Sequence, residues 1–158
     1  MSFAKLSLKG RALKLLAQRE HSRLELQRKL VAHVEEGDDL PAILDELEKR
    51  GFISEQRVVA SVIHSKASRF GTARLVQELR SKGLDYEAVR DASEQLRDTE
   101  LQRATELWCK RFGTPPADLK EKAKQLRFMA SRGFSSAVAS RVLRNAPYSS
   151  FDENDDHI

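Results

Sequence analysis

The sequence has little of several residue types, and each shortage excludes a class of protein. Cys109 is the single cysteine among 158 residues, which excludes an internal disulfide framework and a cysteine-rich metal cluster. Aromatic residues make up only 6% of the chain. No apolar run approaches the roughly 20 residues that a membrane-spanning helix needs, and charges interrupt the N-terminal stretch too often for a secretory signal. We therefore expect a soluble protein of the reducing cytoplasm without membrane contact.

What the sequence has in abundance is charge, at 33% of its residues with a formal net charge of +4. The sign alternates in blocks: 1–36, 57–83 and 107–144 are net basic, whereas 37–56 and 84–106 are net acidic. Salt screens exposed charges beyond about 8–10 Å. A polyanionic partner therefore responds to the local basic blocks more than to the net charge. A set of alternating solvated faces is the plainer alternative.

Helical periodicity predicts about nine helices and no strand. The stretch 69–83 shows the pattern most clearly, because Leu75, Val76 and Leu79 share one apolar face. Gly83 follows that face at the position where a glycine commonly ends a helix. A core built from such amphipathic helices predicts an all-α fold.

Two four-residue signatures mark predicted helix starts. Ser22-x-x-Glu25 and Thr99-x-x-Gln102 have the spacing of a capping box, in which each side chain satisfies a free amide of the first turn. The first predicts a helix beginning at Ser22. The second predicts that one helix ends before Thr99 and that another begins there. The turn at 113–116 then precedes a helix expected to run to Arg132.

The helices also repeat along the chain. A shift of 49 residues matches Ser22, Leu26 and Leu30 to Gly71, Leu75 and Leu79. The repeating unit is a three-helix module of nearly 50 residues, present three times, and such modules stack into an elongated, curved body. The predicted organisation is a loose segment at 1–10, modules at 11–53, 54–97 and 98–145, and an acidic, disordered tail at 146–158.

No arrangement of residues predicts catalysis. The chain has no glycine-rich phosphate loop, no His–Glu metal spacing and no nucleophile elbow. The four histidines are scattered and suit surface or capping roles. Cys109 is expected to be a packed or half-buried thiol, and Trp108 beside it a core residue. We therefore predict a protein that is not an enzyme, with no catalytic residue, metal or cofactor.

Basic residues recur at corresponding places in the modules, on the second helix or the turn before it. Lys120, Lys124 and Arg127 form a single stripe whose like charges repel unless a polyanion neutralises them. The recurrence favours a polyanion-facing groove over a merely soluble surface, but the spacing does not distinguish nucleic acid from an acidic protein. The predicted set is Arg19, Arg23, Arg28, Lys29, Lys66, Arg69, Arg74, Arg80, Lys120, Lys124, Arg127 and Arg132.

Three blocks of sequence resemble the RecX family. They are RALKLLA with EHSRLEL within 11–26, FGTARLVQELRSKG at 70–83, and QLRFMASRGF at 125–134. Members of that family are bacterial cytoplasmic regulators of the RecA recombinase, which acts in homologous recombination, DNA repair and the SOS response. They bind along the groove of the RecA–single-stranded DNA filament and inhibit ATP hydrolysis, strand exchange and co-protease activity. The resemblance implies the same here; EEGDD at 35–39 and the acidic tail are outside its pattern.

The resemblance and the basic clusters together predict a negative regulator that acts as a monomer. Its partners are expected to be the RecA nucleoprotein filament and, through direct contact, the phosphates of single-stranded DNA. One alternative is a non-specific helical module that competes for single-stranded DNA without touching the recombinase. Another is a helical adaptor whose basic faces bind an unrelated acidic protein. Steep salt dependence on bare DNA is the signature of the competitor.

Overall fold

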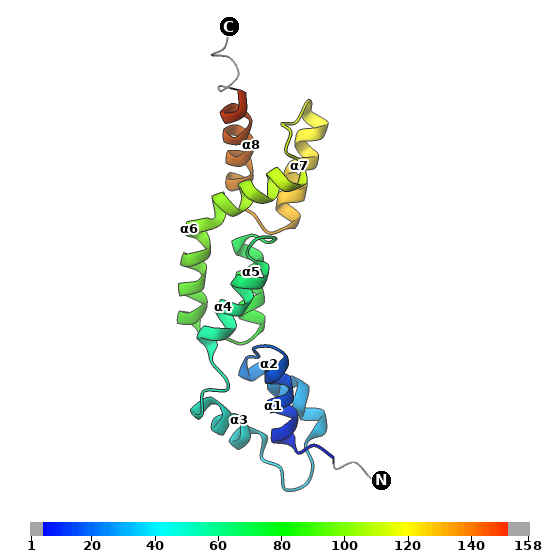
Figure 1. Cartoon of the computed structure of the whole chain (residues 1–158), viewed down its shortest axis with the longest axis vertical. Coiled ribbons are helices and arrows are strands. Elements are labelled where there is room, and N and C mark those ends of the chain that lie inside the picture. The colour runs from blue at the N-terminus through cyan, green and yellow to red at the C-terminus, as the bar shows by residue number, and fades with distance from the viewer. Residues whose placement is uncertain (1–4, 152–158) are drawn as a thin grey trace. The chain divides into compact units, whose positions relative to one another are not determined.

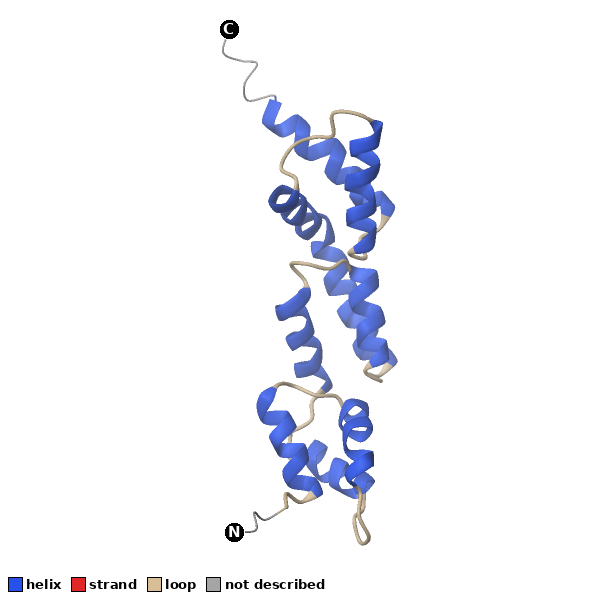
Figure 2. Ribbon diagram, turned by 90° about the vertical axis from the view of Figure 1, so that its right-hand side faces the viewer, coloured by secondary structure: helices blue, strands red, loops and turns tan. Residues whose placement is uncertain are grey.

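The structure, a computed structural model, describes residues 5–151, with side chains up to residue 145. Over this range the chain forms eight α-helices, one 3-10 turn and no strand (Figures 1 and 2), which confirms the all-α prediction. None of these helices is both long and apolar enough to cross a membrane. The elements are α1 (Leu8–Gln18), α2 (Arg23–Leu30), η1 (Val31–His33), α3 (Leu40–Lys49), α4 (Glu55–Lys66), α5 (Thr72–Ser81), α6 (Tyr86–Arg111), α7 (Leu119–Ser131) and α8 (Ser136–Phe151).

The helix count differs from the expected nine because α6 is continuous over 26 residues. The predicted capping box at Thr99-x-x-Gln102 is wrong. The Thr99 hydroxyl donates to the carbonyl oxygen of Leu96 one turn earlier, which a threonine inside a helix does without ending it. The same hydroxyl accepts from Nε of Arg103. Sequence spacing alone does not separate a cap from this interior bond.

Two helix ends, the start of α1 and the end of α8, differ from the sequence prediction, whereas α7 begins after the predicted turn. The prediction of a loose segment at 1–10 is wrong for residues 8–10. The Ser7 hydroxyl accepts a hydrogen bond from the Gly10 amide and caps α1, which begins at Leu8. Helix α7 begins after the prolines, where Asp118 caps the amide of Glu121. Helix α8 continues to Phe151, past the predicted start of the disordered tail, since each further residue adds a hydrogen bond to a helix already nucleated. The rest of that tail, 152–158, lies outside the described residues.

The chain divides into two compact units. Unit 1 contains 1–61 and 79–89, and unit 2 contains 62–78 and 90–158. The boundaries fall inside α4, α5 and α6, so the predicted middle module contributes to both units. The module boundaries themselves stay a prediction.

Unit 1 is built on a leucine core beneath α1, α2 and α3. Leu26, Leu30, Leu44 and Leu47 are buried at the centre of this core. Helix α2 begins at its predicted signal, because Ser22 and Glu25 form the complete capping box there. Asp39 caps α3, which has a proline in its first turn. The core therefore fixes the positions of the basic side chains on the outer face of α2.

The second core lies in unit 2, among the end of α6, α7 and α8. Trp108, Met129 and Val142 are buried there, and the indole N–H of Trp108 donates to Oε1 of the buried Gln125 at 2.8 Å. The prediction that Trp108 is a core residue is confirmed. The prediction that Cys109 is packed or half-buried is wrong, because its side chain is exposed. Consecutive residues of a helix point about 100° apart, so the burial of Trp108 leaves Cys109 facing solvent.

Candidate polyanion-binding surface

The site in unit 2 begins where the start of α5 meets the end of α7. The Gly71 amide donates to the carbonyl oxygen of Arg132 at 2.7 Å. Gly71 is buried, and Gly133 has a φ of +88° that an L side chain rarely adopts. This close approach of two backbones brings Phe70 and Arg74, from one end of α5, beside Arg132 from the end of α7.

Three guanidinium groups surround the ring of Phe70. The Cζ atoms of Arg69, Arg74 and Arg132 lie 5.4, 4.2 and 5.5 Å from the ring centroid. A cation over an aromatic face is attracted by the ring quadrupole, with a gain of about 0.5–1 kcal/mol at an exposed site. Arg74 also donates to the carbonyl oxygen of Ser131 at 3.1 Å. The arrangement holds three positive charges together, and none of the three arginines forms an ion pair with a residue that the structure describes.

The series of rings and guanidinium groups continues from Arg132. Its Cζ lies 5.2 Å from the centroid of Phe128, and Arg111 lies 5.4 Å from the same ring and 5.8 Å from Phe112. The two rings meet edge to face at 5.3 Å. We call the whole series the arginine–phenylalanine ladder: Arg69, Phe70, Arg74, Arg132, Phe128, Arg111 and Phe112. All three rings are half-buried.

A buried arginine on α6 positions the first rung of the ladder. Arg103 is 8% exposed, and its Nη1 donates to the carbonyl oxygens of Ala67 at 2.9 Å and Phe70 at 2.7 Å. Its other N–H groups bond to Leu96, Thr72 and Thr99. Burial lowers the pKa of Arg103, and the nearby Glu100 carboxylate opposes that shift. The guanidinium thus binds the turn before α5 to α6.

The predicted stripe of Lys120, Lys124 and Arg127 lies next to the ladder. All three side chains are exposed, and none makes an ion pair with any residue that the structure describes. Together with Arg111 they line a cleft of about 640 Å³. The cleft also contains the carboxylates of Asp118 and Glu121, but its four cations outnumber them, and a net positive cleft attracts a polyanion. The remaining lining residues are Phe112, Thr114, Pro115, Ala117, Asp118, Glu121 and Gln125.

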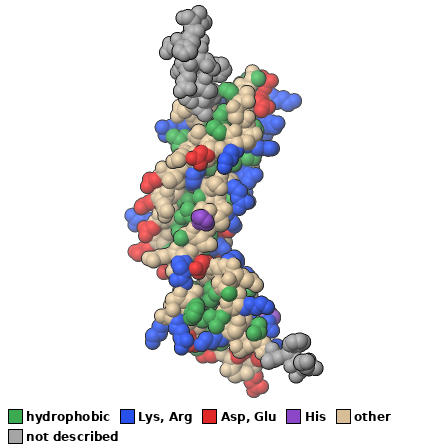
Figure 3. Space-filling model, viewed as in Figure 1, with side chains coloured by type: hydrophobic (Ala, Val, Ile, Leu, Met, Phe, Trp, Pro, Cys, Tyr) green, Lys and Arg blue, Asp and Glu red, His purple; other side chains and the backbone are tan. Residues whose placement is uncertain are grey.

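Basic side chains predominate along one edge of unit 2, and acidic side chains are more frequent along the other. Figure 3 shows mainly lysine and arginine side chains along the edge of α7, with acidic ones at its upper end, and several acidic side chains interspersed with basic ones along the opposite edge, over α6. The ladder and the stripe are therefore on the basic side, where a polyanion meets little repulsion.

Unit 1 has a second basic cluster, around α2. The Ser22 hydroxyl donates to the carbonyl oxygen of Lys82 at 2.6 Å, and Arg28 donates to that of Ser81 at 3.1 Å. Glu25 accepts from Arg19 at 2.6 Å and from Lys82 at 3.1 Å. These bonds dock the start of α2 on the end of α5. The start of α5 docks on the end of α7 in the same way, through the bond from Gly71 to Arg132.

The predicted cations do not all have the same freedom to bind a partner. Arg19 pairs with Glu25, Arg23 with Asp45 and Glu48, and Lys66 with Glu78. Lys29 donates to the imidazole of His21. Arg80 is exposed on unit 1 without an ion pair to another described residue. The structure thus brings Arg69, Arg74 and Arg132 together at one place and Lys120, Lys124 and Arg127 at another, all in unit 2.

Sequence reasoning missed Arg111 and the three phenylalanines of the ladder. A signal was present, because the dipeptide Arg-Phe occurs at 69–70, 111–112 and 127–128. Basic residues interleaved with aromatic ones are typical of surfaces that bind single-stranded nucleic acid. Arg103 carried no such signal, since a buried arginine and an exposed one look alike in a helical pattern.

Comparison with known sequences gives consistent matches. Residues 98–143 match the family model described as RecX, third three-helix domain. The chain is 57% identical to "Regulatory protein RecX" of Leptothrix cholodnii, over 94% of this chain and 95% of that protein. It is 52% identical to the protein of the same name from Ralstonia nicotianae, over 89% of each chain.

Solved structures show the same fold at low sequence identity. A crystal structure of RecX from Lactobacillus salivarius has a TM-score of 0.72 and 17% identity, over 89% of this chain and 95% of that chain. A crystal structure of regulatory protein RecX has a TM-score of 0.70 and 21% identity, over 87% of this chain and 70% of that chain.

Proposed function

Because the chain belongs to the RecX family of regulatory proteins, we propose that it is a negative regulator of the RecA recombinase. It binds the RecA–single-stranded DNA filament along its groove and contacts the DNA phosphates directly. Occupying the groove excludes the second duplex and the co-protease substrate. The inhibition of ATP hydrolysis, strand exchange and co-protease activity follows from that occupancy.

The observation that carries this proposal is the joined ladder and stripe in unit 2. Exposed guanidinium and ammonium groups neutralise phosphates, and half-buried rings and guanidinium planes stack on unpaired bases. None of the described carboxylates forms an ion pair with the stripe, so its cations are available for phosphate. None of the described residues on this surface forms a pattern that reads base edges, which suits a partner of variable sequence.

The alternative of simple competition for DNA makes a different prediction. A competitor needs to coat the DNA before it inhibits, whereas a filament-binding regulator acts at far lower concentration. The first experiment therefore titrates the protein into RecA while following single-stranded-DNA-dependent ATP hydrolysis. Fluorescence anisotropy in the same buffer measures its binding to the same DNA without RecA. We expect inhibition well below the concentration that saturates bare DNA.

The stripe is tested by reversing its charges with Lys120→Glu, Lys124→Glu and Arg127→Glu together. We expect the concentration needed for half-inhibition to rise at least tenfold. The fold should persist, because all three side chains are exposed and the new carboxylate at position 120 lies in the first turn of α7, where the helix dipole favours negative charge. Helical circular dichroism verifies this. The dependence of DNA affinity on salt should become shallower, by about 0.7 in the logarithmic slope for each phosphate that is no longer neutralised.

A matched control changes the same formal charge elsewhere. Lys49→Glu, Arg90→Glu and Arg97→Glu reverse three exposed cations outside the ladder and the stripe. We expect its half-inhibition to stay within twofold of the unmodified protein. If both triple variants lose inhibition equally, net charge alone is responsible and the proposed surface is wrong. Inhibition only after the DNA is saturated would instead support competition.

A further inference from the structure

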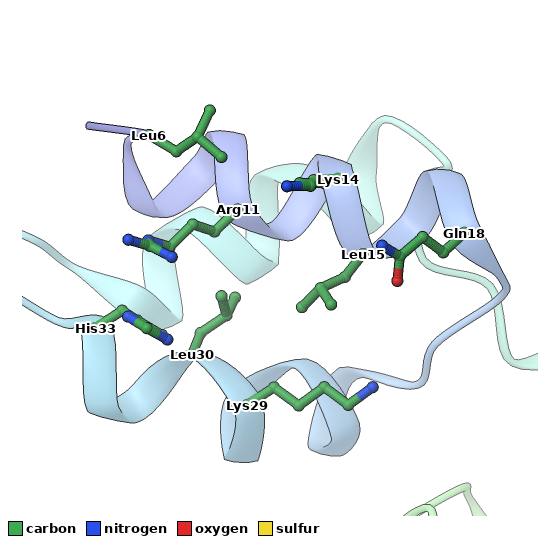
Figure 4. A pocket seen from close by; sticks show the side chains of 8 residues that line it. All are labelled: Leu6, Arg11, Lys14, Leu15, Gln18, Lys29, Leu30 and His33. Carbon is green, nitrogen blue, oxygen red and sulfur yellow. The ribbon is translucent and has the colours of Figure 1, made fainter. Parts of the chain in front are cut away.

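A second pocket, in unit 1, has a chemistry different from that of the ladder. It is a space of about 300 Å³ between α1 and the segment formed by α2 and η1. Figure 4 shows Leu15 and Leu30 facing the space from the two helices, with Leu6 close to its edge. These side chains give the pocket an aliphatic floor. Leu6 is 47% exposed, so part of that floor is in contact with water.

Cationic and polar side chains surround this floor. Arg11 and His33 lie at one end of the pocket, and Gln18 and the amine of Lys29 lie at the other (Figure 4). Lys14 completes the rim. No carboxylate lines the pocket, and neither Arg11 nor Lys14 has an ion pair with any residue that the structure describes. The rim is therefore a concentrated positive charge beside apolar surface.

The floor does not suit a nucleobase. Leu15 and Leu30 offer no ring face to a base, and the imidazole of His33 is the one aromatic ring among the lining residues. The ladder of unit 2 has three phenylalanine rings for the same purpose, and stacking on an aromatic side chain contributes about 1–3 kcal/mol per base. At about 300 Å³ the pocket is at the lower end of the usual range for small-molecule sites. It suits one large apolar side chain, and the cations suit carboxylates on the residues beside it.

We propose that this pocket docks a short acidic segment of a protein partner. One apolar side chain of that segment lies on Leu15 and Leu30, and flanking carboxylates pair with Arg11 and Lys14. Lys29 donates one hydrogen bond to His21 and has two further N–H groups for a third carboxylate. Charge complementarity selects the acidic residues, and burial of the anchor supplies the non-electrostatic part of the affinity. The proposal is independent of the ladder and the stripe, because it uses none of their residues.

The test uses the full chain and a fluorescein-labelled peptide of six aspartates interrupted by one leucine and one phenylalanine. Binding is followed by anisotropy at physiological salt. We expect Lys14→Glu to weaken binding at least tenfold, because Lys14 is exposed and its reversal adds a repulsive charge without disturbing the core. Lys49→Glu, which makes the same charge change on α3, should stay within twofold. Replacing both apolar residues of the peptide by serine should weaken binding at least fivefold.

Each other occupant gives a distinct result that would overturn the proposal. If the peptide with two serines bound as tightly as the original, only charge attraction would be acting and the apolar anchor would be refuted. An oligothymidylate that competes with the peptide, and whose own binding is lost in Lys14→Glu, would assign the pocket to nucleic acid. Self-association in sedimentation that disappears in Lys14→Glu would make the occupant a second copy of the chain. Absence of binding at millimolar peptide would also refute it.

Discussion

A Cβ atom on Gly71 would stand 2.3 Å from the carbonyl carbon and oxygen of Gly133. Real Cβ atoms essentially never approach backbone so closely, so α5 and α7 meet here only because position 71 has no side chain. The junction also places the first ring of the ladder beside Arg132. It is therefore both a packing constraint and the origin of the basic surface.

Gly71→Ala should destabilise the protein by about 1–3 kcal/mol, because the new methyl group forces two backbones apart. Urea unfolding followed by circular dichroism measures the change. Gly10→Ala is the control, since position 10 lies inside α1 and its nearest neighbour is the Ser7 hydroxyl at 3.1 Å. Alanine is the better helix former there, so the free energy of unfolding should change by less than about 1 kcal/mol. If Gly71→Ala and Gly10→Ala lost the same free energy of unfolding, the close contact of Gly71 with Gly133 would not be a packing constraint.

Arg103→Met should also cost about 2–4 kcal/mol, although it replaces a charge by an apolar side chain of similar length. The carbonyl oxygens of Ala67 and Phe70 would lose their donor in a buried place, and leaving buried acceptors unsatisfied is costly. Arg97→Met, at an exposed position of the same helix, provides the reference. A loss below about 0.5 kcal/mol for Arg103→Met would mean that water replaces the guanidinium.

Phe70→Leu tests whether the ladder contributes aromatic stacking as well as charge. Leucine keeps an apolar side chain but removes the ring face on which Arg74 lies. Because stacking on an aromatic side chain contributes about 1–3 kcal/mol per base, affinity for single-stranded DNA should fall at least fivefold. The slope of affinity against salt should stay the same, since the substitution changes no charge. Phe52→Leu, an exposed ring in unit 1, should have no effect.

Glu25 should make folding stability depend on pH in the acid range. Burial by itself would raise the pKa of Glu25, but hydrogen bonds from Arg19, the Ser22 amide and Lys82 outweigh it and lower the pKa to about 2. A carboxyl whose pKa is depressed on folding stabilises the protein above its unfolded value of 4.5, and this contribution is lost as the pH falls towards 2. We expect a loss on the order of 1 kcal/mol in unfolding experiments between pH 5 and 2. Glu25→Gln should remove most of that slope.

His21 should add a separate step near neutral pH. Burial lowers its pKa below 6.5, and the charges of Arg19 and Lys29 act in the same direction, although the carbonyl oxygen of Arg19 and the charge of Glu25 oppose the shift. The unfolded chain therefore binds the proton more readily than the folded one, so stability falls as the pH decreases below 6.5. Nuclear magnetic resonance of the imidazole measures this pKa directly. A value above 6.5 would contradict the prediction.

The sequence by itself determined the helical class, most helix starts and the recurrence of basic residues. These features are local: a capping box at Ser22, a glycine after Leu79 and an apolar face repeated every three to four residues act within one or two turns. The family resemblance followed from the same blocks. The continuous α6 was missed because the Thr99 hydroxyl donates to a carbonyl oxygen inside the helix. The spacing of Thr99 and Gln102 in the sequence does not show which backbone group that hydroxyl bonds to.

Only the tertiary structure decided which cations lie together. Arg111 and Arg132 are 21 positions apart in the sequence, yet both lie against Phe128, because α7 packs back against the end of α6. Arg19 and Lys124 look equally basic in a helical pattern, but within the part of the chain that the structure describes only Arg19 forms an ion pair. Charge and periodicity are properties of single residues and turns, whereas pairing, burial and the shape of a pocket depend on how helices distant in the chain pack together.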